Sequence, residues 1–146
     1  MLRPHCTFTI GDTLLALSAA TVTEFGRIGE LTPVPLSAPS IAGLVNLRGQ
    51  IVTVLDIRRH FNLDPRGADE PLGIFFRHEE ALCCLLVDAV DDIVEIDDDD
   101  LEPPPGNVAS SVREVLVGVC KQPGRLLMIV DPHRAIVALS SKAVQA

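Results

Sequence analysis

The chain has 146 residues, of which 47% are hydrophobic and only 3% aromatic, with no Trp and no Tyr. A chain of this length buries roughly 70% of its unfolded surface, so we expect one domain, residues 1–146, with an aliphatic core. The formal net charge of −8 at pH 7 argues against nucleic acid or an anionic membrane surface as a partner.

The sequence has no apolar run of the roughly 18 residues that would cross a membrane, and its N-terminus lacks the apolar segment of a signal peptide. We therefore expect a cytoplasmic protein with no membrane insertion. The cysteines, Cys6, Cys83, Cys84 and Cys120, show no CxxC spacing. In a reducing cytosol we expect them to be small apolar core residues and neither disulfides nor metal ligands.

The first predicted element is a hairpin of strands Cys6–Ile10 and Thr13–Leu17, joined by a Gly-Asp turn. The next segment, Ala19–Ile28, is compatible with a strand or with a short helix followed by a strand. Within it, Glu24 is interpreted from the residues alone as an exposed carboxylate on an edge strand. Three prolines between residues 33 and 39 then predict an ordered loop.

The stretch from Ile41 to Phe61 contains two apolar runs, Gly43–Leu47 and Ile51–Ile57, joined across Arg48, Gly49 and Gln50. Flanking breakers and β-branched residues predict a hairpin with a buried second strand, followed by one helical turn. Period-2 alternation places Asn46 and Arg48 on the same face. A cation at such a tip lines a surface or pairs with a carboxylate, for which Glu24 and Asp56 are the candidates.

The segment 62–71 is rich in turn residues and is the predicted boundary between two lobes, at approximately 8–66 and 72–139, with the chain termini possibly shared. Strand Leu72–Phe76 and a turn at Arg77–Glu80 should follow. Ala81–Val87 is apolar on both faces, which predicts a central strand buried on both sides.

A strongly acidic segment follows, with nine acidic residues between Asp88 and Glu102 and no basic residue among them. The spacing does not fit a calcium-binding loop, because the apolar Leu101 falls at a ligand position and no glycine stands where that loop requires one. We expect Asp97–Asp100 to form a solvated loop that ends in three prolines.

In the C-terminal part the sequence predicts a strand region Val112–Cys120, a type II turn at Gln122–Arg125 and a returning strand Arg125–Val130. Asp131 followed by proline predicts the start of a helix that reaches about Leu139.

The segment that begins at Gly43 repeats 75 positions later, at Gly118, over nineteen residues without a gap. The residues identical between the two copies are Gly43/Gly118, Gly49/Gly124, Asp56/Asp131 and Arg59/Arg134. Two similar β lobes follow from this repeat, with Asp56 and Asp131 as helix caps. A phospho-accepting Asp56 is the alternative, but the acidic pair, lysine and alternating helices of a receiver domain are missing.

The sequence gives no reason to expect an active site. His5, His60, His78 and His133 have no metal-binding or catalytic spacing, and no nucleotide-binding or hydrolase motif occurs. We therefore expect a binding module without catalysis, cofactor or metal.

The residues IAGLVNLRGQIVTVLDIRRHF closely resemble the signature of the CheW-like chemotaxis adaptors. The resemblance runs from about Phe8 to about Leu139. It implies a mostly β fold of two SH3-like five-stranded barrel lobes on a shared aliphatic core, with short helices after each lobe. It also implies a non-catalytic scaffold that couples chemoreceptors to a CheA-type histidine kinase.

The partners implied by this resemblance are the regulatory domain of the kinase and the helical cytoplasmic tip of a receptor. Residues that match the family's pattern on the partner-facing surface are Val22, Glu24, Gly43, Asn46, Leu47, Arg48 and Gly49.

The chain departs from the family pattern at Thr53, where the family usually has proline, and around Leu14 and Ser18, where it often has an aromatic residue and a proline. These departures leave room for altered partners. An adaptor of another chemosensory pathway, such as pilus motility or developmental signalling, is a further alternative, because the sequence does not distinguish it from an adaptor of flagellar chemotaxis. A small-molecule-binding β-barrel or an enzyme is the alternative of another class, and it would need polar side chains that converge inside an apolar pocket.

Overall fold

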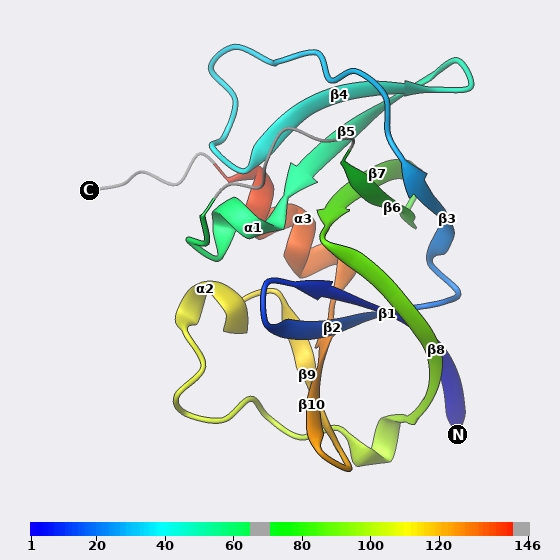
Figure 1. Ribbon diagram of the computed structural model, residues 1–146, viewed down its shortest axis with the longest axis vertical. Coiled ribbons are helices and arrows are strands. Elements are labelled where there is room, and N and C mark those ends of the chain that lie inside the picture. Colours follow the sequence, from blue (N-terminus) through cyan, green and yellow to red (C-terminus); the bar gives the residue numbers. More distant parts are fainter. Residues whose placement is uncertain (65–70, 142–146) are drawn as a thin grey trace.

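The computed structural model describes residues 1–64 and 71–141, and over these ranges the chain forms two five-stranded sheets (Figure 1). One sheet has the order β8-β1-β2-β10-β9, with β1 (Leu2–Ile10), β2 (Thr13–Ser18), β8 (Ala89–Asp97), β9 (Leu116–Gln122) and β10 (Arg125–Val130). The other has the order β3-β6-β7-β5-β4, with β3 (Val22–Arg27), β4 (Ile41–Leu47), β5 (Gln50–Asp56), β6 (Leu72–His78) and β7 (Ala81–Val87). We call them the split lobe and the continuous lobe, because the first uses both ends of the chain and the second only its middle.

The mostly β, two-lobe fold predicted from the sequence is confirmed, but the sheets divide the chain differently from the expected lobes 8–66 and 72–139. Strands β6 and β7 lie after the connector, yet they pair with β3 and β5, which precede it. The N-terminal hairpin β1–β2 instead pairs with β8 and β10. Each sheet is thereby completed by strands from the other side of the connector.

The internal repeat is visible in the order of the strands. Each lobe contains one parallel pair, β2 with β10 and β7 with β5, flanked by antiparallel neighbours. Superposing the two orders equates β4–β5 with β9–β10 and β6–β7 with β1–β2. The sheet that contains the second copy of the repeat, β9–β10, is therefore completed by the N-terminal hairpin β1–β2.

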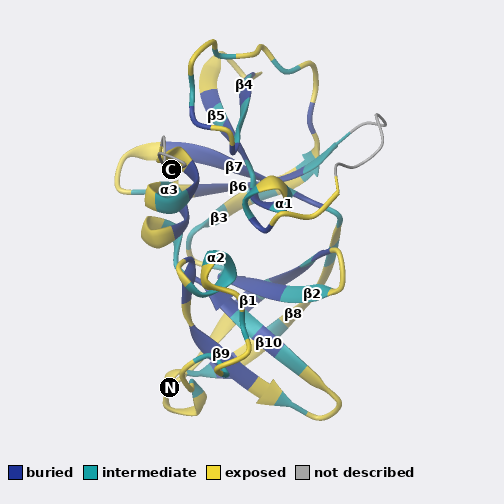
Figure 2. Ribbon diagram, turned by 90° about the vertical axis from the view of Figure 1, so that its left-hand side faces the viewer, coloured by how far each residue is buried: buried dark blue, intermediate teal, exposed yellow. Residues whose placement is uncertain are grey.

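Buried side chains form three clusters, one shared and one inside each lobe. Figure 2 shows that buried residues occur along strands of both lobes. The central strand β7 shows how they are divided: Cys83 and Leu85 face the shared cluster, whereas Leu82 and Cys84 face the interior of the continuous lobe. Both cysteines are buried for this reason, as expected for a strand covered on both faces.

Short helices follow the repeated hairpins and lie between the lobes (Figure 1). Helix α1 (Ile57–His60) begins after Asp56, which accepts a hydrogen bond from the Arg59 N–H, and α3 (Pro132–Ser140) begins after Asp131, which accepts from the His133 and Arg134 N–H groups. These bonds satisfy donors that the first helical turn leaves open.

The structure decides one open alternative and corrects two local predictions. The segment after Ala19 holds strand β3 and no helix, which is the strand alternative. Val112 lies in a helical turn, α2 (Ser110–Arg113), so the strand begins only at Leu116. Asp98–Asp100 is exposed, as expected for a solvated segment, but it forms a 3-10 turn: Asp97 caps this turn, and its carboxylate accepts a hydrogen bond from the Asp99 N–H.

The repeated glycines Gly43 and Gly118 are explained by backbone that crosses close to them. A methyl group at Gly43 would lie 2.7 Å from the Thr32 carbonyl oxygen, and one at Gly118 would lie 2.9 Å from that of Glu102. In both lobes the crossing residue forms a β-bridge with the residue after the glycine, Thr32 with Leu44 and Glu102 with Val119. Only glycine fits such an approach.

Candidate functional site

The tip of the β4–β5 hairpin, which we define as Asn46–Gly49, is a common type of two-residue turn with an unusual first residue. Leu47 pairs with Gln50, and the two residues between them, Arg48 and Gly49, have φ angles of 51° and 86°. Positive φ at both central positions is the type I′ turn, which matches the twist of the strands. The Asn46 carboxamide oxygen accepts a hydrogen bond from the Gly49 N–H at 2.8 Å, so two residues of the NLRG motif hold this turn.

Arg48 is an uncommon residue for this position. Left-handed backbone is costly for a residue with a β-carbon, by roughly 1–2 kcal/mol, and asparagine or glycine is preferred there. The equivalent hairpin β9–β10 avoids the cost, because it has Pro123 and then Gly124, with positive φ at the glycine alone. The arginine therefore occupies a strained position that the other copy fills without strain.

The Arg48 guanidinium is paired with Glu24, one of the two carboxylates proposed from the sequence. Both terminal nitrogens, Nη1 and Nη2, donate to Glu24 Oε2, at 2.7 and 2.6 Å. Glu24 lies on β3 and the hairpin tip adjoins β4, the two edge strands of the sheet. The ion pair therefore crosses between opposite edges, which shows that the sheet is curled into a barrel. Asp56 caps α1 and is not the partner.

This ion pair is exposed to solvent, with 67% of the Arg48 side chain and 37% of the Glu24 side chain accessible. Exposed pairs contribute at most about 1 kcal/mol, because water screens the charges and two flexible side chains must be ordered. The pair thus orients the guanidinium at the surface and adds little stability.

Three other residues predicted to bind a partner are partly buried or constrained by the fold. Val22 is half-buried against the shared cluster, and Leu47 is half-buried against the interior of the continuous lobe. Gly43 is held by the close approach of Thr32. Of the predicted set, the four residues Asn46–Gly49 form the hairpin tip and Glu24 is joined to it by the ion pair, whereas Gly43 lies further along β4 towards its start.

Two exposed apolar side chains near this tip were missed from the sequence. Phe25 follows Glu24 on β3 and is 56% exposed, and Ile51 pairs with Asn46 and is 60% exposed. Large apolar side chains that remain exposed beside an oriented ion pair are typical of protein-binding surfaces. The sequence carries no clear signal for their exposure, because the segment around Phe25 does not alternate strictly and Ile51 opens an apolar run that predicts burial.

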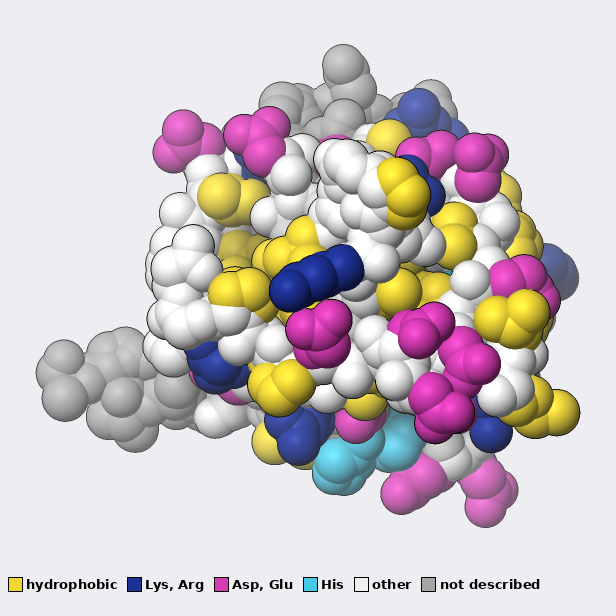
Figure 3. Space-filling view, turned by 90° about the horizontal axis from the view of Figure 1, so that it is seen from below, with side chains coloured by type: hydrophobic (Ala, Val, Ile, Leu, Met, Phe, Trp, Pro, Cys, Tyr) yellow, Lys and Arg dark blue, Asp and Glu magenta, His cyan; other side chains and the backbone are white. Residues whose placement is uncertain are grey.

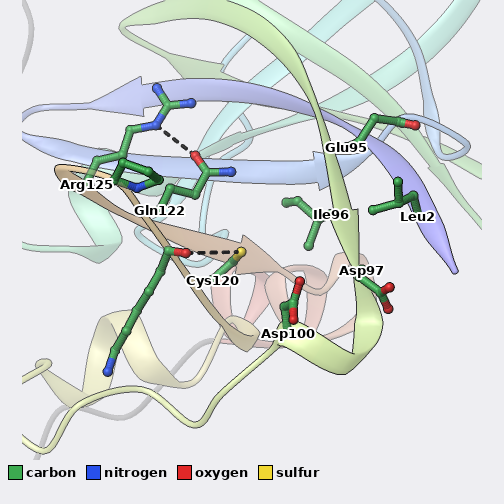
Figure 4. Close-up of a pocket in the computed structure, with 10 residues that line it drawn as sticks. Leu2, Glu95, Ile96, Asp97, Asp100, Cys120, Gln122 and Arg125 are labelled. Carbon is green, nitrogen blue, oxygen red and sulfur yellow. Dashed lines mark hydrogen bonds between the residues drawn. The ribbon is translucent and has the colours of Figure 1, made fainter.

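The opposite end of the molecule carries a shallow pocket between β8 and the β9–β10 hairpin (Figure 4). Its lining mixes carboxylates with a guanidinium, and the Arg125 Nε donates to the Gln122 carboxamide oxygen at 2.8 Å. Hydrogen bonds from the Asp99 N–H and the N-terminal ammonium lower the pKa of Asp97. Seen from this end, acidic side chains are spread over the surface with apolar ones between them (Figure 3).

Nothing in this pocket resembles a catalytic arrangement. Burial raises the pKa of the Cys120 thiol, with further contributions from Asp100 and Glu102, so its sulfur is protonated at neutral pH and a poor nucleophile. Within residues 1–64 and 71–141, no three His, Cys, Asp or Glu side chains are already gathered as a metal site. None of the helices in those ranges is both long and apolar enough to span a membrane.

Comparison with known proteins gives consistent results. The model of the CheW-like domain matches residues 4–139. Among curated proteins, the chain is 24% identical to "Chemotaxis protein CheW" of Treponema pallidum, over 95% of this chain and 83% of that protein. It is 27% identical to the protein of the same name from Bacillus subtilis, over 93% and 88%. Among solved structures, scaffolding protein TtCheW from Thermoanaerobacter tengcongensis superposes with a TM-score of 0.83 at 26% identity, over 99% of both chains.

Proposed function

The chain belongs to the CheW-like domain family, and on that premise we propose that it joins a chemoreceptor to the regulatory domain of a CheA-type histidine kinase. It is a chemotaxis coupling adaptor without catalytic activity. The receptor would contribute the helical tip of its cytoplasmic part, which places the adaptor in the cytoplasm.

The observation that carries this proposal is the strained Arg48 at the hairpin tip. A turn that keeps a non-glycine residue in left-handed backbone, where the equivalent hairpin has none, retains that residue for its side chain. The ion pair with Glu24 is too exposed to account for it through stability. Contact with a partner does account for it, because a planar guanidinium forms paired hydrogen bonds to carboxylates.

Surrounding residues supply the rest of such a surface. Phe25 and Ile51 offer apolar area that a partner would bury, and Glu24 fixes the direction of the arginine. Burial of apolar side chains around a central arginine is a common composition for binding hot spots. In this proposal Val22, Asn46, Leu47, Gly43 and Gly49 shape the surface and hold the turn.

The test is to replace Arg48 and to measure stability and binding together. Arg48→Ala should change the free energy of unfolding by less than about 1 kcal/mol. It should also weaken the affinity for the kinase regulatory domain or for a receptor-tip peptide by about tenfold or more.

The matched control is Arg125→Ala, because Arg125 begins the returning strand of the equivalent hairpin and is also exposed. This variant should bind both partners as the unmodified protein does. If Arg48→Ala unfolds at a clearly lower temperature and still binds when cooled, Arg48 is a structural brace and the partner surface lies elsewhere.

A further inference from the structure

Two of the polar contacts between the lobes occupy equivalent places in the repeat but differ in chemistry. In the first, Arg58 of α1 reaches the turn of the β1–β2 hairpin: its Nη1 lies 2.7 Å from Asp88 Oδ2, which also accepts from the Gly11 N–H. In the second, α3 reaches the turn of the β6–β7 hairpin, where His133 stands at the position equivalent to Arg58. The first contact is an ion pair between fixed charges, and the second is a pair of imidazoles.

The two imidazoles face each other across the lobes. His78 Nε2 lies 3.0 Å from His133 Nδ1, with ring centroids 4.9 Å apart and the ring planes tilted by 48°. Two nitrogens bound at about 2.0–2.1 Å to one tetrahedral zinc ion would be roughly 3.4 Å apart. The two nitrogens are therefore a few tenths of an ångström closer than two ligands of one ion would be, and the rings must both separate and turn so that both lone pairs point at the ion.

A carboxylate adjoins the pair. Glu79 Oε1 lies 3.7 Å from the same His78 nitrogen, and the side chain is 79% exposed, so it is free to swing towards an ion. The backbone conformation of Glu79 is a second sign of a functional site. Glu79 has a φ of 58°, whereas the equivalent turn residue of the other lobe is Gly11, with a φ of 60°. A left-handed conformation suited to glycine is here imposed on a glutamate, and strain of this kind is concentrated at functional sites.

We propose that His78 and His133, together with Glu79, form a binding site for a divalent transition-metal ion of the zinc class. Two imidazoles and one carboxylate are a ligand set that zinc accepts, with water in the fourth position. The third ligand must move to complete the set, which is why no group of three is preformed in the described residues. The two histidines lie 55 positions apart in the sequence, which hides this site from a search for short motifs.

Binding of the ion requires one of the two imidazoles to change its tautomer. In the free protein, one ring of the pair donates its N–H to the bare nitrogen of the other. For both facing nitrogens to bind the ion, the donor ring must carry its proton on its remote nitrogen instead, which is His78 Nδ1 or His133 Nε2. A neutral imidazole has this tautomer available, so binding releases no proton from a neutral pair.

The ion would connect the two lobes. His78 ends β6 of the continuous lobe, and His133 lies in the first turn of α3, which follows the last strand of the split lobe. The Asp131 carboxylate fixes the start of that helix by accepting from the His133 N–H at 2.9 Å. Binding would therefore add a link between the lobes, which at this place share a hydrogen bond between the two imidazoles and the packing of α3 against β6.

The experiment titrates metal-free, untagged protein with zinc by calorimetry and follows the melting temperature. We expect one ion per chain and a melting temperature that rises with zinc concentration, because an ion that binds only the folded state stabilises it. His78→Gln and His133→Gln should each weaken zinc binding by at least about tenfold, and Glu79→Gln by less. Nitrogen-15 NMR of the imidazoles should show shifts at His78 Nε2 and His133 Nδ1.

Two control variants make the result specific. Cys6→Ser removes the one thiol that is not fully buried and should leave zinc binding intact. Glu80→Gln changes the exposed neighbour of Glu79 in the same turn and should also have no effect. Zinc binding that survives both histidine substitutions, or is lost in Cys6→Ser, or is absent from the unmodified protein, would overturn the proposal.

Discussion

The two hairpins β4–β5 and β9–β10 occupy equivalent places in the two lobes, but they end in different turns. The first has Arg48 and Gly49 at its tip, both with positive φ, and the second has Pro123 and Gly124, with positive φ at the glycine alone. In the first, the tip carries a cation paired with Glu24 on the opposite edge of the sheet. In the second, the proline carries no charge at all.

What the copies keep in common is what the backbone requires. Gly43 and Gly118 admit a crossing strand, Gly49 and Gly124 supply left-handed backbone, and the aspartates cap helices. The copies differ in the side chains at two turn positions. Arg48 in one lobe is replaced by Pro123 in the other, and Glu79 is replaced by Gly11. Comparing two copies within one chain thus separates residues that build the fold from residues that are available for binding.

The largest expected effect tests the shared part of this comparison. Gly43→Ala and Gly118→Ala should each lower the free energy of unfolding by about 2–3 kcal/mol, because the added methyl group meets a carbonyl oxygen that cannot move freely. Denaturant unfolding measures the change. Gly106→Ala is the control, since nothing lies near its added methyl group. A variant that is tolerated in one lobe alone would show that the two crossings are not equivalent.

The next expected effect compares the shared cluster with the interior of one lobe. Cys83 and Cys84 are neighbours on β7, and each faces one of the two clusters. Replacing either by serine should destabilise by about 1–3 kcal/mol, because a hydroxyl without a partner is then buried. Comparable losses would show that both faces of β7 are equally part of the core, and a neutral Cys83→Ser would show that the lobes pack loosely there.

The same cysteines give a measurement in the unmodified protein. Burial, and to a smaller degree the neighbouring Cys83, raises the pKa of Cys84 from 9.0 to about 12. Because the folded state holds this thiol protonated, its contribution to stability is complete below about pH 9 and falls as the pH rises towards 12. Native thiol labelling at pH 8 should modify Cys6, which is partly exposed, before either cysteine of β7. Rapid labelling of Cys84 would contradict the buried strand.

Local signals account for what the sequence could predict. A glycine turn between apolar runs gave the β4–β5 hairpin, and aspartate before a helical turn gave both caps, because each feature is determined by a few adjacent residues. The pairing of Arg48 with Glu24 was one of two candidates, since charge alone does not choose between carboxylates.

Features set by distant pairing could not be predicted in the same way. The pairing of β1 with β8 joins residues about 90 positions apart, and no local pattern records it. The burial of Cys83 and Cys84 was predicted from a strand that is apolar on both faces, but which cluster each cysteine faces depends on how the two lobes pack. The contact between His78 and His133 likewise exists only because α3 lies against β6.

The smallest expected change in stability tests the difference between the two hairpin tips. Arg48→Asn keeps the type I′ turn and replaces a strained residue by one that tolerates left-handed backbone. The relief of strain offsets the loss of an exposed ion pair, so the free energy of unfolding should stay within about 0.5 kcal/mol of its original value or rise slightly. Partner affinity should nevertheless fall as far as in Arg48→Ala, because asparagine cannot reach a carboxylate that the longer guanidinium contacts. Unfolding and partner titration on the same preparation measure both quantities.

If Arg48→Asn is markedly less stable, the ion pair holds the barrel closed and the strain is retained for structure. If it is as stable and binds fully, the arginine side chain serves neither purpose, and the apolar pair Phe25 and Ile51 becomes the part of this surface to test.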